Sequence, residues 1–319
     1  MKTKILTKKE ICADALAKFT YDVRQNSPLK RNDRTLDRLE AYFEDIKGRD
    51  NIVLIIVYEE AVNDPVGSMI VDLNIIPGMG IYLPWQPVIH PNRNVNTIAL
   101  ALIEQSKKLV MIHSLSGMEA WLPLSYSGME QMCSTYVKWY ESCGFTSVGT
   151  EYYMNVRTSD VMLDDIQLPS DIEVLSLDKV TNEEIKETVF ETFNNSQDGW
   201  FLNHKKPQQV GLFLNWFNRD EAYDKDASIV LRKDDEFIGF IVVRLEDDRP
   251  NIGPIGILPK ARGKGLGKAL LATTLRRLKE KKYESVDLEA NTINDQALGL
   301  YRGLGFKKQY RTLMYAWIP

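Results

Sequence analysis

Apolar and polar positions follow two different periods in the C-terminal half of the chain. Residues 265–282 place leucines and other apolar side chains every three or four positions, which predicts a helix with one buried stripe. Residues 285–291 alternate between apolar and polar, which predicts a strand with one face in the core. Weaker patterns of the same two kinds predict helices at 182–193, 205–218 and 294–302, and strands at 171–177, 227–232, 237–245, 251–258 and 310–317.

The N-terminal half repeats part of this order. Apolar residues 51–58 and 67–74 flank a turn at Asp64-Pro65 and predict a hairpin. Residues 88–91 then lead into a predicted helix at 96–110.

One short segment of each half is closely similar to its counterpart. Trp139–Phe145 mirrors Leu300–Phe306, since each has a tyrosine near its start and ends on a Gly-Phe pair. We therefore predict two copies of one domain, over residues 1–156 and 171–319, with a linker at 157–170. An unrelated α/β domain with a chance match is the alternative for the N-terminal half.

Glycines at 263, 265 and 267 open the helix predicted at 265–282. They leave backbone N–H groups uncovered at the positive end of the helix dipole, where anions bind. The dinucleotide fingerprint requires G-x-G-x-x-G, and the nucleoside triphosphate loop requires Ser or Thr after Gly-Lys. Neither matches, because the glycines run G-x-G-x-G and the two Gly-Lys pairs are followed by glycine and alanine.

Four cations surround this loop: Lys260, Arg262, Lys264 and Lys268. The positive end of a helix disfavours cations, so their presence indicates that a polyanion completes the site. A solvated basic turn is the alternative.

Two signatures resemble those of the Gcn5-related N-acetyltransferase (GNAT) superfamily, which binds acetyl-coenzyme A. The first is R-x-x-G-x-G from Arg262 to Gly267, and the second is N-x-x-A-x-x-L-Y from Asn294 to Tyr301, followed by Gly-Phe. The clear resemblance covers about residues 171–319. It implies an α/β fold of two tandem domains, each a mixed, mostly antiparallel twisted sheet flanked by helices, with a splayed fourth and fifth strand pair.

The resemblance also implies roles for residues of this chain. Tyr301 would donate a proton to the departing sulfur. Asn294 would hold the pantetheine arm together with backbone groups of Ile255 and Ile257. The pyrophosphate would be bound by Arg262, Gly263, Lys264, Gly265, Leu266, Gly267 and Lys268.

The general base is left open by these signatures. Many superfamily members carry a glutamate where this chain has Asn251, and others carry one at the position of Glu289. Glu289 lies on the polar side of its predicted strand, so it is either the base or a solvated strand residue. The run from Glu246 to Asp248 either receives a cationic amine at the rim or forms a solvated turn.

The acceptor pocket is expected from the segment 195–201. Trp200 and Phe201 in it either form a mobile lid or anchor the loop to the core. In the N-terminal half, Thr97 stands at the position of Gly265, so a branched side chain occupies the place where phosphate would approach. We therefore expect the N-terminal copy to be degenerate and unable to bind coenzyme.

Composition narrows the remaining classes. Residues 251–319 carry a net charge of +8 in a chain of net charge −4, which favours a local anionic ligand over nucleic acid. The longest apolar run is too short for a membrane span, the N-terminus lacks the apolar core of a signal peptide, and three cysteines are too few for a disulfide framework. We expect a cytoplasmic protein without nucleic-acid or membrane partners and, since its three histidines lack ligand spacing, without a metal.

These observations predict an N-acetyltransferase that uses acetyl-coenzyme A and transfers its acetyl group directly to a primary amine of a small molecule or a peptide. The alternative is a non-catalytic protein that binds acyl-coenzyme A as a sensor or structural ligand. The sequence leaves the acceptor, the acyl chain length and the oligomeric state open.

Overall fold

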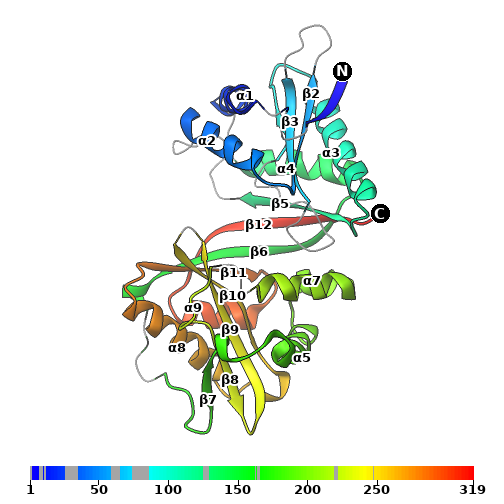
Figure 1. Cartoon of the computed structure of the whole chain (residues 1–319). Helices are drawn as coiled ribbons and strands as arrows, with labels where there is room; N and C mark the ends of the chain where they lie inside the picture. The colour runs from blue at the N-terminus through cyan, green and yellow to red at the C-terminus, as the bar shows by residue number, and fades with distance from the viewer. Residues whose placement is uncertain are drawn as a thin grey trace. The chain divides into compact units, whose positions relative to one another are not determined.

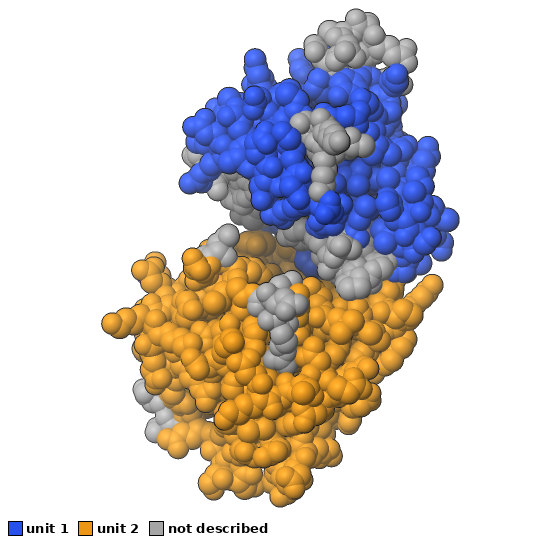
Figure 2. Space-filling model, viewed as in Figure 1, with its two compact units in different colours: residues 1–148, 313–319 blue, residues 149–312 orange. Residues whose placement is uncertain are grey.

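The computed structural model describes residues 2–6, 10, 12–25, 35–58, 65–73, 86–124, 129–161, 163, 166–218, 222–246 and 248–319. The chain forms two compact units (Figures 1 and 2): unit 1 comprises residues 1–148 and 313–319, and unit 2 comprises residues 149–312. Each unit combines helices with a sheet, which confirms the expected α/β class. Asp64 of the predicted turn and Asp247 of the acidic run lie outside the described residues.

The sheet of unit 2 is mixed and mostly antiparallel. Its strands lie in the order β12-β6-β11-β10-β9-β8-β7. The pair β10–β11 is parallel, whereas the pairs β6–β11, β9–β10, β8–β9 and β7–β8 are antiparallel. The strands are β6 (Thr146–Arg157), β7 (Glu173–Ser176), β8 (Ile229–Lys233), β9 (Glu236–Glu246), β10 (Arg249–Ile257), β11 (Ser285–Asn291) and β12 (Lys307–Trp317).

Strands β10 and β11 separate soon after they meet. Asn251 pairs with Asp287 and the next residue of each strand pairs as well, but beyond Ile252 the described pairing of β10 is with β9 alone. The register of β10 on β9 shifts between Ile252 and Ile255, around Gly253-Pro254, as a proline inside a strand predicts. The splayed fourth and fifth strand pair is therefore confirmed in unit 2.

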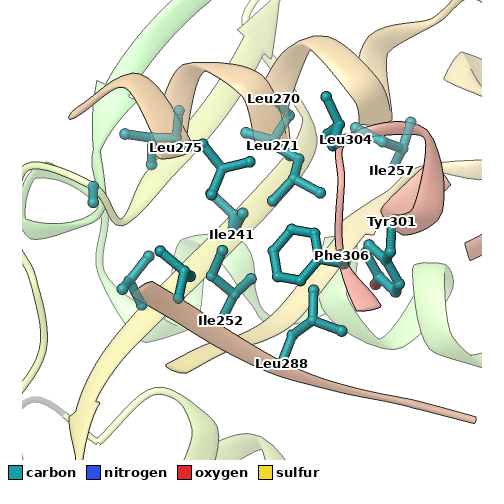
Figure 3. Close-up of a cluster of buried hydrophobic side chains, with 14 of the residues drawn as sticks. Ile241, Ile252, Ile257, Leu270, Leu271, Leu275, Leu288, Tyr301, Leu304 and Phe306 are labelled. Atoms are coloured by element: carbon teal, nitrogen blue, oxygen red, sulfur yellow. The ribbon is translucent and has the colours of Figure 1, made fainter. Parts of the chain in front are cut away.

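Helices cover both faces of this sheet (Figure 1). Helix α8 packs its leucines on Ile241 and Ile252 (Figure 3), and the whole stripe predicted for it is buried, including Thr274. On the other face, an aromatic cluster packs around Phe240, with Phe193 and Phe217 next to it. The helices are α5 (Asn182–Asn194), α6 (Gly199–Asn203), α7 (Lys206–Trp216), α8 (Leu266–Glu280) and α9 (Asp295–Gly303).

Unit 1 is built around a four-stranded sheet in the order β1-β2-β3-β4. Strand β5 lies outside this sheet and beside the end of β12, so β4 and β5 are separated here too. The elements are β1 (Lys2–Leu6), α1 (Ala13–Gln25), α2 (Leu36–Lys47), β2 (Ile52–Tyr58), β3 (Pro65–Asp72), β4 (Val88–Ile89), α3 (Val95–Ile112), β5 (Met118–Leu124) and α4 (Met129–Ser142).

The continuous apolar run of β2 is explained by burial on both faces. Leu54 and Ile56 join a cluster with α1 and α2, whereas Ile55 and Val57 join a cluster with α3 and α4. A strand covered on both sides has no polar face, so its sequence does not alternate. The predicted hairpin is confirmed, since β2 and β3 pair antiparallel.

Two strands are divided between the units, β6 at residue 149 and β12 at residue 313. Tyr315 of β12 is buried in the core of unit 1, with Leu313 and Trp317 packed against the same core. The compact units therefore differ from the expected domain boundaries at both ends of the C-terminal domain. Compactness does not test descent from one ancestral domain, so the two-copy organisation stays a prediction.

Candidate active site

The loop between β10 and α8 has the backbone of an anion site. Gly263 and Gly265 both have φ of +77°, in the left-handed region that favours glycine. No other atom lies within 4 Å of the position that a Cβ would take at either glycine. Gly265 caps α8 and provides no side-chain hydrogen bond to it. The first N–H groups of α8 therefore lack a capping side chain, and an anion could accept from them.

Arg262 makes three hydrogen bonds to backbone carbonyls. Its guanidinium donates to the carbonyl oxygens of Ile257 (2.9 Å), Asn195 (2.6 Å) and Thr192 (2.9 Å). This side chain fastens the loop to the end of β10 and to the C-terminal end of α5. Its placement fits a role in holding the loop in shape more directly than a role as a phosphate ligand.

The three lysines of the loop differ from one another. Lys260 forms an ion pair with Glu236, at 2.5 Å. Lys264 and Lys268 are exposed and form no ion pair with any described residue. These two lysines are therefore the cations available to an anion bound at the loop.

The splayed strands place Ile255 and Ile257 next to the start of α8. A Cβ on Gly267 would lie 3.7 Å from Ile257 and 3.8 Å from Leu300 of α9, so the end of β10, the start of α8 and the middle of α9 meet there. Asn294 caps α9, because its side-chain oxygen accepts from the backbone N–H of Ala297 at 3.1 Å. The structure thus brings the start of α8, the end of β10 and the middle of α9 together, and Asn294 lies at the start of the same α9.

Tyr301 has a buried ring and an unpaired hydroxyl. The side chain is 5% exposed and its ring meets Phe306 edge to face (Figure 3). Among the described residues no group forms a hydrogen bond with its hydroxyl. Burial raises the pKa of Tyr301, and the nearby Asp198 carboxylate acts in the same direction. The hydroxyl therefore stays protonated near neutral pH and is free to donate, unlike that of a core tyrosine with a satisfied hydroxyl.

Glu289 lies on the face of β11 opposite the core. It pairs with Tyr153 of β6, whose ring stacks on Tyr310 at 4.6 Å. The side chain is exposed, yet the surrounding protein desolvates it. Desolvation, with the charge of Glu246 adding to it, raises the pKa of Glu289 to about 7. A carboxyl with this pKa changes between acid and base in the range where a general base works.

The segment 195–201 is anchored rather than free. Trp200 and Phe201 lie in α6, are 9% and 0% exposed, and pack against Trp216 of α7. The anchoring interpretation of these two aromatics is therefore the one that holds. Asp198 at the start of α6 accepts from the backbone N–H of Phe201 at 3.0 Å, and its closeness to Tyr301 had no signal in the sequence.

Unit 1 fills the corresponding positions with its own side chains. Asn94 caps α3 and its side-chain oxygen accepts from the N–H of Thr97 at 3.3 Å. Tyr140, at the position of Tyr301, donates its hydroxyl to Gln86 at 2.7 Å, and Gln86 donates to the carbonyl of Trp121 in β5 at 2.8 Å. Helix α3 thus has a side-chain cap, which α8 lacks, and the Tyr140 hydroxyl has a partner, whereas no described residue bonds to the hydroxyl of Tyr301.

Two negative findings concern only the described part of the chain. None of its helices is long and apolar enough to cross a membrane. No group of three or more His, Cys, Asp or Glu side chains in it is placed to hold a metal ion.

Known proteins resemble this chain in sequence and in fold. Residues 187–306 match the model of the acetyltransferase (GNAT) family. A mycothiol acetyltransferase of Arthrobacter sp. (strain FB24) is 24% identical over 237 residues, covering 71% of this chain and 68% of its own length. The matched segment lies within unit 2, so this part of the chain is similar to the acetyltransferases of the GNAT family.

Solved structures extend the likeness of the fold to the whole chain. A GCN5-related N-acetyltransferase from Sphaerobacter thermophilus has a TM-score of 0.63 at 15% identity, with 99% of this chain and 95% of its own covered. A tandem GNAT protein from the clavulanic acid biosynthesis pathway has a TM-score of 0.59 at 13% identity, with 99% and 98% covered. At this identity the likeness concerns the fold alone.

Proposed function

We propose that this chain binds one acetyl-coenzyme A, in unit 2, and transfers its acetyl group directly to a primary amine of a small molecule or a peptide. The observation that carries the proposal is the loop before α8. Its left-handed glycines and uncapped N–H groups lie beside the splay of β10 and β11, and an unpaired tyrosine hydroxyl stands on the next helix.

The coenzyme would be held by the residues of this loop and of the splay. Backbone N–H groups from Gly263 to Lys268 would bind the pyrophosphate, with the side chains of Lys264 and Lys268 nearby. Backbone groups of Ile255 and Ile257 would pair with the pantetheine arm, because β10 has no described partner there on the side of β11. Asn294 would add a polar contact from the start of α9.

Acetyl-coenzyme A supplies an activated acyl group as a thioester. In our proposal Glu289 accepts a proton from the amine, which then forms a bond to the acyl carbon as the carbon–sulfur bond breaks. Tyr301 donates its proton to the sulfur that leaves. Both roles fit the protonation states given by the structure, since Tyr301 is protonated near neutral pH and Glu289 titrates near pH 7.

Unit 1 would be the degenerate copy and would bind no coenzyme. The Asn94 cap and the contact between Tyr140 and Gln86 support this, because they occupy the groups that a coenzyme would use. We further propose that residues 1–156 and 171–319 are two copies of one domain. We also propose that the protein is cytoplasmic and has no nucleic-acid partner.

Calorimetry and a thiol-release assay together test the proposal. The protein is titrated with coenzyme A, and then acetyl-coenzyme A is offered with a panel of amines that includes mycothiol precursors, since relatives are named mycothiol acetyltransferases. We expect one binding site and amine-dependent release of thiol. For the loop variant Gly265→Val, the control is Gly303→Ala, because a Cβ at Gly303 also meets no atom within 4 Å but lies outside the loop. Binding without transfer to any amine would favour the sensor alternative.

A further inference from the structure

Asn251 stands at the centre of a polar patch on the sheet of unit 2. Its strand neighbours are Arg244 on β9 and Asp287 on β11, and residues directly opposite in a sheet share one face. Glu289 lies two residues beyond Asp287 and therefore on the same face. Glu246 lies two residues beyond Arg244 on this face as well.

The amide of Asn251 binds one carboxylate of this patch, and Glu289 lies on the same face of the neighbouring strand. The amide nitrogen donates to Glu246 Oε1 at 3.0 Å, and Asn251 lowers the pKa of Glu289. The residue is 9% exposed, so an amide here needs partners within the protein.

A carboxylate at this position would have the opposite effect. Glu246 and Glu289 already repel each other, and this repulsion raises the pKa of Glu289. A third negative charge between them would raise it further, whereas a donor offsets part of the repulsion. An asparagine is thus compatible with a base on β11, where a glutamate on β10 would compete with it.

We propose that Asn251 is a positioning residue for catalysis, whose amide binds Glu246, offsets its charge on this face of the sheet, and so keeps Glu289 as the proton acceptor for the amine. This inference rests on the proposed function, in which Glu289 is the base. Asn251 itself touches neither substrate nor coenzyme in this role.

Other charged and titratable groups face Glu289 from the strands around it. Arg244 lowers its pKa, and Asp287 raises it. Tyr153 lies directly opposite on β6, and Glu151 is the next residue of that strand on the same face. Arg249 pairs with Glu246 at the start of β10. All of these remain in place when only residue 251 is changed, so a shift in titration can be assigned to the amide.

Two variants of similar size separate the contributions of the amide. Asn251→Leu removes both donors, and Asn251→Asp replaces them with a charge. The acidic limb of the pH profile of kcat/KM, with an inflection near pH 7 in the wild type, should move upward by about half to one pH unit in Asn251→Leu and further in Asn251→Asp. A purely structural role would lower activity without moving the limb.

The matched control is Asn51→Leu. Asn51 of unit 1 also donates to a carboxylate across strands, Asp72 at 2.6 Å, and its loss should leave the limb unmoved. Coenzyme A calorimetry verifies that each variant is folded. Carbon-13 NMR of the side-chain carboxyls, with the Glu289 signal assigned by its absence in Glu289→Gln, reads the proton affinity of Glu289 without any need for activity.

The outcomes are distinct. An upward shift of both the NMR titration and the activity limb supports the proposal, and a limb that stays at its wild-type position within experimental error in both variants overturns it. A shifted NMR titration with an unmoved limb would show that Glu289 is not the base and would overturn it too. A wild-type protein that acetylates no amine would overturn the proposed function, and the NMR titration would still show whether Asn251 affects the pKa of Glu289.

Discussion

Replacing Tyr301 by phenylalanine separates stability from catalysis. The substitution removes one hydroxyl that has no hydrogen-bond partner among the described residues and leaves the buried ring and its contact with Phe306 in place. Loss of a buried hydrogen bond typically costs about 1–3 kcal/mol, but none is lost here. The free energy of unfolding should therefore match that of the wild type within about 0.5 kcal/mol or exceed it.

Turnover should fall in the same variant. General acid catalysis contributes about 10²–10⁴-fold, and we expect a loss near the lower end because water can replace the hydroxyl as proton donor. Affinity for coenzyme A should stay nearly unchanged, since the loop at 263–268 is untouched. Urea unfolding, calorimetry and the thiol-release assay measure the three quantities.

Tyr140→Phe in unit 1 is the matched control, with the opposite expected result. The hydroxyl of Tyr140 is fully buried and donates to Gln86 at 2.7 Å, so its removal leaves an acceptor unsatisfied. We expect a loss of about 1–3 kcal/mol in stability and no change in the chemical step. Unaltered turnover of Tyr301→Phe, measured where single-turnover kinetics show that chemistry is rate-limiting, would refute the acid role. A large loss of stability in Tyr301→Phe would show that the hydroxyl does have a hydrogen-bond partner in the folded protein.

Three further predictions concern the coenzyme and the base. Calorimetry should give one coenzyme A site per chain, and two equivalent sites would contradict the degeneracy of unit 1. Gly265→Val should abolish coenzyme binding while the chain stays folded, because the side chain would enter open space at a cost of about 1–2 kcal/mol for its φ of +77°; unchanged affinity would show that the loop is not the anion site. Glu289→Gln should lower kcat/KM most above pH 7 and progressively less below it, because the wild-type carboxyl is then already protonated. The pKa of Glu289 is raised on folding, so its ionised form destabilises the native state as pH rises through 7. Glu289→Gln should therefore be more stable than the wild type at pH 8, by no more than about 1 kcal/mol because the side chain is exposed, and equally stable near pH 4. A difference in stability that does not depend on pH would contradict this.

The C-terminal elements could be predicted because their signals are local. The stripe of α8 and the alternation of β11 each repeat within a few residues, and their bounds agree with the structure to within a few residues. The glycines before α8 were interpretable for the same reason, since a left-handed turn and a helix start are adjacent in the chain. The positions of Tyr301 and Glu289 follow from the bounds of the helix and strand that carry them.

The remaining features depend on partners that are distant in sequence. The role of Arg262 in coenzyme binding stays a prediction, and the bonds of its guanidinium to the carbonyls of Asn195 and Thr192, about 70 residues earlier, had no local signal. The strand β6 was not predicted, although Tyr152, Met154 and Val156 alternate with polar residues and would have indicated it. The entry of Tyr315 into the core of unit 1 had no local signal, because a hydrophobic strand looks the same whichever core receives it.

Hydrogen-bonding capacity distinguishes the two units more clearly than their sequences do. A polar group that no protein group satisfies and that water can reach remains available to a ligand. In unit 2 the first N–H groups of α8 have no capping side chain, and no described residue forms a hydrogen bond with the hydroxyl of Tyr301. In unit 1 Asn94 satisfies Thr97, and Gln86 satisfies Tyr140. The side-chain cap and the tyrosine partner found in unit 1, and their absence among the described residues of unit 2, agree with the proposal that unit 2 alone binds the coenzyme.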